Sequence, residues 1–266
     1  MALEILVGCD PEVFVKQNGI FRSAYGLIKG DKKNPQKVPR GAVQVDGMAL
    51  EFNIDPAATE DEFVINVQDV LNTMKGMVPD YEVVATPVAH FDLDYIRSQP
   101  ADALELGCDP DYNAWTGVPN DKPNAERPMR TASGHVHIGW TNGEDIYDPI
   151  HRSSAMAVGR QMDFYLGLNS LFYDNDVERR EMYGKGGCVR VKPYGVEYRT
   201  LSNAWLNSEK LMRWVFRAAT KGVNDLVNGI DLSEKYGDIS NIINTNDKES
   251  ALKIIQAEGI ELCYAN

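Results

Sequence analysis

The sequence predicts an α+β fold in which a mostly antiparallel sheet has one polar face and is covered by helices on the other face. Short apolar segments separated by Gly-containing turns indicate antiparallel strands in the first 54 residues. Helical spacing of apolar residues at 60–77, and again from residue 208 onward, indicates the covering helices. Polar residues two positions apart on several strands indicate the polar face.

The first strands are predicted at residues 4–7, 12–16 and 21–23. Asn18 and Gly19 lie between the second and third of these strands, and this dipeptide favours a two-residue hairpin turn. A β-hairpin therefore opens the predicted fold.

Residues 29–40 contain five basic residues and two prolines against one acidic residue. We interpret this segment as a mobile loop, because proline interrupts regular strands and helices. Strands at 43–45 and 48–54 then flank Asp46 and Gly47, a dipeptide that strongly favours a hairpin turn.

The middle of the chain contains a helix, a strand and a long loop. Residues 60–77 place Phe63 and Val67 on one helical stripe, and residues 81–89 are apolar and β-branched, as in a strand. Residues 101–130 are rich in Pro, Asp, Asn and Gly, so we expect a long ordered loop there.

A further strand is expected at residues 132–140. A helix is expected from Asp148 to about residue 171, because Asp caps a helix and the proline that follows it is favoured in the first turn. A strand pair is predicted at 188–192 and 196–201.

Composition and charge restrict the class of protein. The chain has 266 residues, 43% hydrophobic and 25% charged, which is typical of a globular protein with a substantial core. We expect one catalytic domain over residues 1–266, whose C-terminal part, 206–266, is mostly helical. The formal net charge of -12 argues against nucleic-acid and membrane partners, because those surfaces attract a positive face.

Cysteine usage and hydropathy are typical of a cytoplasmic protein. No CxxC spacing occurs among Cys9, Cys108, Cys188 and Cys263, which indicates neither a zinc knuckle nor a dense disulfide framework. No segment approaches the roughly 20 apolar residues that span a bilayer, and the first residues lack the apolar core of a signal peptide.

Polar pairs with a spacing of two residues occur on five predicted strands. They are Asp10 with Glu12, Glu51 with Asn53, His135 with His137, Arg190 with Lys192, and Glu197 with Arg199. Carboxylates and neutral imidazoles bind divalent cations, and arginine and lysine hold phosphate oxygens, so the set suits a metal–nucleotide complex. Oxygen-rich ligands favour Mg²⁺ or Mn²⁺, although a His-x-His pair with acids also accepts zinc.

The common nucleotide-binding loops do not occur. No GxxxxGK[ST] motif is present, and residues 184–187 lack the spacing of GxGxxG. Gly186 and Gly187 suit a simple turn and a phosphate-binding loop equally well, and the adjacent Lys185 favours phosphate. Arg180 is either a solvated helix end or a further phosphate contact.

The order of the polar motifs resembles that of the metal and phosphate motifs of the glutamine synthetase superfamily. These motifs are Asp10-Pro11-Glu12, Glu51 within 46–53, Ser133-Gly134-His135-Val136-His137, Arg190, and Glu197-Tyr198-Arg199. The whole chain resembles the phage-encoded branch, the carboxylate–amine (COOH-NH2) ligases of phiEco32-like phages. The resemblance implies a fold like the glutamine synthetase catalytic domain and, for a phage protein, the host bacterial cytoplasm as its location.

The resemblance also implies roles for the matching positions. The implied metal ligands are Glu12 and Glu51 for one ion, and Asp10, His135 and Glu197 for a second ion nearer the transferred phosphate. The implied phosphate contacts are Arg190 and Arg199, beside the candidates Arg180 and Lys185, and the implied substrate contacts are His137 and Asn53.

The chain departs from the superfamily pattern at two points. The first strand of glutamine synthetases carries Glu-x-Glu where this chain has Asp10-x-Glu12, and Asp46 is a poorly spaced candidate for a further carboxylate ligand. We assign Asp46 as the candidate acceptor of the amine proton. With Glu51 and Arg199, it completes the expected catalytic set.

The activity implied by the resemblance is ATP-dependent amide formation through an acyl phosphate, with Mg²⁺ or Mn²⁺. The expected substrates are an amino acid, a peptide or another small acid and amine, and residues 29–40 would close on the nucleotide as a lid. Related synthetases build sites between subunits, so a homo-oligomer stays an open alternative to a monomer. The other functions left open are a guanidino-kinase-like phosphotransferase, a zinc-dependent hydrolase and a non-catalytic binding protein.

Overall fold

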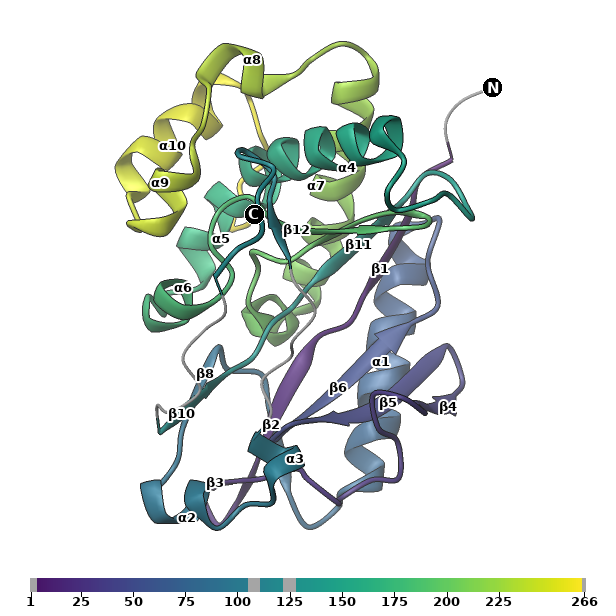
Figure 1. The fold of residues 1–266 in the computed structure, drawn as a ribbon, viewed down its shortest axis with the longest axis vertical. Helices are drawn as coiled ribbons and strands as arrows, with labels where there is room; N and C mark the ends of the chain where they lie inside the picture. The colour runs from purple at the N-terminus through teal and green to yellow at the C-terminus, as the bar shows by residue number, and fades with distance from the viewer. Residues whose placement is uncertain (1–3, 105–110, 122–127, 265–266) are drawn as a thin grey trace.

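The computed structural model describes residues 4–104, 111–121 and 128–264 (Figure 1). Within these ranges the protein has the predicted α+β fold, and its strands pair in antiparallel fashion. Three long helices pack against the strands, namely α1 (Glu60–Met77), α4 (Pro149–Met162) and α7 (Glu209–Val227).

One sheet has the strand order β1-β11-β13-β12-β9. Its strands are β1 (Leu6–Cys9), β11 (Val136–Gly139), β13 (Gly195–Tyr198), β12 (Cys188–Lys192) and β9 (Tyr112–Asn113). Val7, Ile138 and Val196 on this sheet are fully buried in the core that includes residues of α4 and α7. The intervening residues form the opposite face, where His137 lies directly across from Glu197.

A second sheet has the order β3-β2-β6-β5-β4, and β7 also pairs with β2. Its strands are β2 (Glu12–Gln17), β3 (Ile20–Arg22), β4 (Gln36–Val38), β5 (Gly41–Asp46), β6 (Ala49–Ile54) and β7 (Glu82–Val84). Leu50 and Phe52 are buried in the core with Phe63 of α1, because alternate side chains of β6 face that helix. Glu51 therefore lies on the opposite face of β6.

The two sheets are joined at Asp10 and Pro11, between β1 and β2. β1 pairs with β11, whereas Glu12 pairs with Glu51 of β6. Pro11 has no N–H to give to a ladder, and its carbonyl accepts a hydrogen bond from Phe52 N at 3.2 Å. The chain thus leaves one sheet and enters the other within two residues, so both polar faces meet there.

The remaining elements lie at the two ends of the molecule (Figure 1). At one end are β8 (Val88–His90), α2 (Leu93–Arg97), α3 (Ala101–Leu104) and β10 (Met129–Thr131). At the other are α8 (Leu232–Tyr236), α9 (Ser240–Asn244) and α10 (Lys248–Ala257), which pack on α5 (Leu168–Tyr173). The short elements α6 (Glu178–Met182) and the 3₁₀ turn η2 (Asn203–Asn207) complete the chain.

The helix expected to end near residue 171 continues through a π-helical turn, η1 (Asp163–Gly167), between α4 and α5. The strand expected at 81–89 is divided into β7 and β8, which pair with different partners on either side of Pro87. The predicted loop at 29–40 contains β4, and the second hairpin turns at Gly47 and Met48, one residue later than expected. Residues 105–110 and 122–127 of the predicted long loop lie outside the described residues.

Cys9, Cys188 and Cys263 are free thiols, whereas Cys108 lies outside the described residues. In the ranges that the structure describes, none of the helices combines the length and apolar character that a membrane crossing requires.

Candidate functional site

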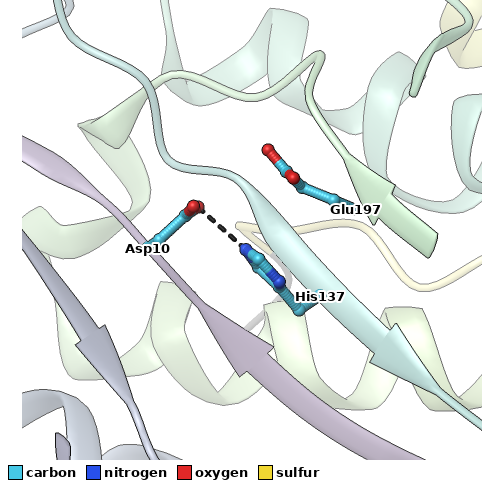
Figure 2. Close-up of side chains that lie close together, drawn as sticks. All are labelled: Asp10, His137 and Glu197. Atoms are coloured by element: carbon cyan, nitrogen blue, oxygen red, sulfur yellow. Dashed lines mark ion pairs between the residues drawn. The ribbon is translucent and has the colours of Figure 1, made fainter. Parts of the chain in front are cut away.

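Three neighbouring strands bring Asp10, His137 and Glu197 together on the polar face (Figure 2). Asp10 follows β1, His137 is on β11 and Glu197 is on β13. The antiparallel register places His137 directly opposite both Gly8 and Glu197. A suitable donor atom of each of the three residues lies within 4.8 Å of the others, so they are spaced like ligands of one cation.

Asp10 and His137 form the ion pair that is drawn as a dashed line in Figure 2. Asp10 Oδ1 and His137 Nε2 are 3.0 Å apart, yet both atoms are buried and neither has a hydrogen-bond partner among the described residues. Neighbouring ligands of an octahedral ion with bonds of about 2.1 Å lie roughly 3.0 Å apart. The pair therefore fits two ligands that face a shared cation.

The predicted ligand His135 lies beside this group. Its Nδ1 is 3.2 Å from Asp10 Oδ1 and 3.4 Å from Glu197 Oε1. Burial, and then the neighbouring Arg199, lower the pKa of His135 to about 3, so the imidazole is neutral as a metal ligand must be. Burial works to raise the pKa of Asp10, but His137 and His135 outweigh it and hold that pKa well below its usual value.

A second acidic group is formed by Glu12, Asp46 and Glu51, with donor atoms again within 4.8 Å of one another. Glu12 and Glu51 are directly paired across β2 and β6, an arrangement in which like charges repel. Asp46 enters the group because it ends β5, two residues beyond Gln44, which pairs with Glu51. Its spacing along the sequence concealed this position, since the hairpin between β5 and β6 folds it back.

The pKa values of this second group are raised because its carboxylates are buried close to one another. Burial, and then Asp46 and Asp10, raise the pKa of Glu12 to about 8. Burial, followed by Asp10, Asp46 and Glu12, also raises the pKa of Glu51 well above its usual value. Carboxylates held together in this way favour either protons or a divalent cation, which makes the group chemically suited to Mg²⁺ or Mn²⁺.

Basic side chains lie around Glu197, which is completely buried. Lys192 Nζ is 2.8 Å and Arg190 Nη1 is 3.4 Å from Glu197 Oε2, and Arg199 Nη1 binds Oε1. Arg199 is held further by Asp111, at 3.4 Å from its Nε, and its guanidinium lies over the ring of Tyr183. Arg190 and Arg199, both predicted phosphate contacts, therefore lie beside the candidate ion ligands.

The other predicted residues lie further from this cluster or at its edge. Arg180 is buried against Asp174 and Ser170, and Lys185 is exposed in the segment that follows α6. Asn53 is half-buried on β6, two residues beyond Glu51 and on the same face.

Sequence reasoning missed three contributors to the site. Lys32 places its Nζ 2.7 Å from Asp46 Oδ1, Tyr194 binds His137, and Asp111 binds Arg199. The five basic residues of 29–40 singled out that segment but not Lys32. The turn residues Pro193 and Gly195 indicated the position of Tyr194. Asp111 ends the segment GCDPD at 107–111, which repeats the GCDPE motif of 8–12 and was the sequence signal for a second wall of the site.

The fold and the site define a class of protein: an α+β protein whose polar sheet face combines ion-binding carboxylates and imidazoles with arginines. Residues 130–226 match the model of a family described as phage phiEco32-like COOH.NH2 ligase-type 2. This match confirms the family resemblance for the motifs that lie within residues 130–226, and the family name indicates a carboxylate–amine ligase, an enzyme that forms a C–N bond. No curated protein matches the chain.

The matched residues include β11, β12 and β13, and thus His137, Arg190, Glu197 and Arg199. Asp10, Glu12 and Glu51 precede the matched segment. The fold brings these carboxylates to the matched part of the site. β1, which precedes Asp10, pairs with β11, and Glu12 in turn pairs with Glu51.

Proposed function

We propose that the protein is an ATP-dependent carboxylate–amine ligase that acts through an acyl phosphate. One observation carries the proposal. Two groups of candidate ion ligands lie on either side of Pro11, where the two sheets are joined, and Arg190 and Arg199 lie beside Glu197 of one group. The family match covers the segment that holds these arginines. Nucleotide phosphates need this combination of divalent cations and guanidinium groups.

In this proposal each of the two groups of candidate ligands holds one ion. Glu12, Asp46 and Glu51 would hold one ion, and Asp10, His137 and Glu197, with His135 alongside, the other. Mg²⁺ or Mn²⁺ at these positions would neutralise phosphate charge and orient the phosphates of ATP. Arg190 and Arg199 would neutralise the charge that develops on the transferred phosphoryl group.

The reaction would proceed in two displacements. An oxygen of the substrate carboxylate attacks the γ-phosphorus of ATP, the bond to the β–γ bridging oxygen breaks, and ADP leaves. The substrate amine then attacks the acyl carbon, the carbon–oxygen bond to phosphate breaks, and the amine proton passes to a carboxylate. Asp46, whose side chain is 14% exposed, is our candidate acceptor. The substrates are proposed to be an amino acid, a peptide or another small acid and amine.

The proposal is tested by measuring phosphate release from ATP in the presence of paired acids and amines with Mg²⁺ or Mn²⁺. We expect Glu51→Gln and Arg199→Ala each to lower substrate-dependent release by about 100-fold or more, because the first removes a proposed ion ligand and the second removes a positive charge proposed to face the phosphates. Arg217→Ala is the matched control, since Arg217 of α7 forms surface ion pairs with Glu60 of α1 and with Glu261, away from the proposed site.

Folding of each variant is checked by circular dichroism, so that a loss of release is not mistaken for unfolding. Activity that survives both site substitutions contradicts the proposal. A stable phosphorylated product without an amide would identify a phosphotransferase instead.

A further inference from the structure

We propose that Tyr194 is a positioning residue that holds the His137 ring so that its Nε2 atom binds a divalent cation together with Asp10 and Glu197. This inference rests on the metal-dependent part of the proposed function. It concerns a residue of the turn between β12 and β13, two positions beyond Lys192.

The turn itself is held firmly in place. The backbone carbonyl of Tyr194 accepts hydrogen bonds from Trp140 N at 3.0 Å and Thr141 N at 3.2 Å. Gly195 follows with a φ of +152°, and a Cβ atom there would lie 2.2 Å from the Ile138 carbonyl oxygen. Only glycine permits this close approach, so the backbone around Tyr194 has little freedom to move away from β11.

The two ring nitrogens of His137 have different environments. Nδ1 forms a hydrogen bond with the Tyr194 hydroxyl, and the two rings lie 6.0 Å apart between centroids. Nε2 lies 3.0 Å from Asp10 Oδ1, and neither atom has a hydrogen-bond partner among the described residues. Tyr194 therefore fixes the ring while it leaves the other nitrogen facing the two carboxylates.

A hydroxyl suits this position better than a group that only donates or only accepts. A histidine that binds a cation through Nε2 carries its proton on Nδ1 and donates it to a neighbouring acceptor. The Tyr194 hydroxyl oxygen accepts a hydrogen bond from Nδ1–H in the cation-bound state, and the hydroxyl can donate a hydrogen bond to Nδ1 when the ring proton is on Nε2 instead. Such an outer contact fixes both the tautomer and the orientation of the ligand.

The donor set also predicts which cation the group prefers. Two carboxylates and one imidazole suit Mn²⁺ better than Mg²⁺, because nitrogen ligands favour transition metals. The all-carboxylate group of Glu12, Asp46 and Glu51 has no such preference for a transition metal.

The experiment titrates the purified, metal-free protein with Mn²⁺ alone, with no nucleotide or substrate, and follows binding by calorimetry and by pulsed electron paramagnetic resonance. We expect Tyr194→Phe to weaken the binding of one Mn²⁺ ion by about 10- to 100-fold and to reduce the spin-echo modulation from the imidazole nitrogen. Tyr165→Phe is the matched control, because it removes a buried hydroxyl that binds Asp225 instead.

Two companion variants separate the outcomes. His137→Asn should remove the contribution of its own ring to the nitrogen signal and leave at most that of His135, and Asp10→Asn should weaken the binding of the same ion. If Asp10→Asn weakens Mn²⁺ binding while Tyr194→Phe binds like the wild type, the role of Tyr194 is wrong and the metal site of the proposed function stands. If the wild type binds Mn²⁺ no more tightly than Asp10→Asn, both the metal site and the role of Tyr194 are overturned.

Discussion

Asp163 connects the polar-face strands with the helical layer through one fully buried carboxylate. Its oxygens accept hydrogen bonds from Trp115 Nε1 at 2.6 Å, the Tyr198 hydroxyl at 2.7 Å and Gly187 N at 2.9 Å. Burial nevertheless raises the pKa of Asp163 to about 6, because desolvation outweighs these three donors. The π-helical turn therefore contains an acid whose ionisation near neutral pH costs stability.

The pH dependence of stability follows from this shift. A carboxyl whose pKa is higher in the folded state than in the unfolded state stabilises the fold fully below its unfolded pKa, near 4, and loses that contribution as the pH rises through about 6. We expect wild type to gain up to about 3 kcal/mol relative to Asp163→Asn between pH 7.5 and pH 4. Urea unfolding of both proteins across this range measures the difference, and a constant difference would contradict the assignment.

In the segment 29–40, the pKa of Lys32 is likewise set by burial and a neighbouring charged group, which act in opposite directions. Residues 29–40 contain β4 and pair with β5, and Val45 N donates to the Gly30 carbonyl at 2.9 Å. This anchoring delivers the Lys32 ammonium to Asp46, where burial works to lower the pKa of Lys32 but the carboxylate outweighs it and raises that pKa. The Lys32 ammonium group thus lies beside a candidate ion site, and it would repel a divalent cation bound there.

We expect Lys32→Met to bind Mn²⁺ about threefold to tenfold more tightly than wild type, because the competing ammonium is removed. Calorimetric titration measures the affinity, and Lys33→Met, in the same segment and exposed, is the control. Equal or weaker binding by Lys32→Met would show that the lysine supports the ion site instead. Closure of this segment over a nucleotide stays a separate prediction.

The sequence predicted the elements well where local signals agree. Helix α1 occupies residues Glu60–Met77, as the apolar spacing predicted, and the period of two residues on β6 correctly placed Phe52 in the core and Glu51 on the opposite face. The division between β7 and β8 was missed, since the apolar residues on both sides of Pro87 continue the same pattern.

The sequence predicted which side chains form the candidate site but not how they are arranged in space. The polar pairs brought Asp10, Glu51 and Glu197 to one face, but their distances depend on which strands pair, and that is set by contacts far apart in the sequence. Asp46 joins Glu12 and Glu51 through a hairpin, and Tyr194 reaches His137 through a turn held by Trp140. Neither arrangement is visible in residue spacing.

At the scale of the whole molecule, a cation that binds the folded state alone should stabilise the entire protein. We expect saturating Mn²⁺ or Mg²⁺ to raise the melting temperature by several degrees, since an ion at 100 times its dissociation constant adds about 2.7 kcal/mol. Glu51→Gln should lose the part of this rise that comes from the group of Glu12, Asp46 and Glu51, whereas Glu82→Gln on β7, whose side chain is exposed, should keep the full rise. A rise that is equal in all three proteins would contradict an ion at the group that contains Glu51.

The passage of the chain from one sheet to the other at Asp10 and Pro11 acts as a fixed spacer. Two residues of extended chain span at most about 7 Å, so Asp10 and Glu12 hold the two ion groups at a separation that neither sheet can change alone. Pro11 stiffens this spacer by restricting its own φ angle. Because side chains alternate along an extended chain, one residue inserted between Asp10 and Glu12 would turn Glu12 to the opposite face. Two inserted residues would restore its direction but move the two ion groups apart. The geometry of the whole site thus depends on the length of this connection between the two sheets.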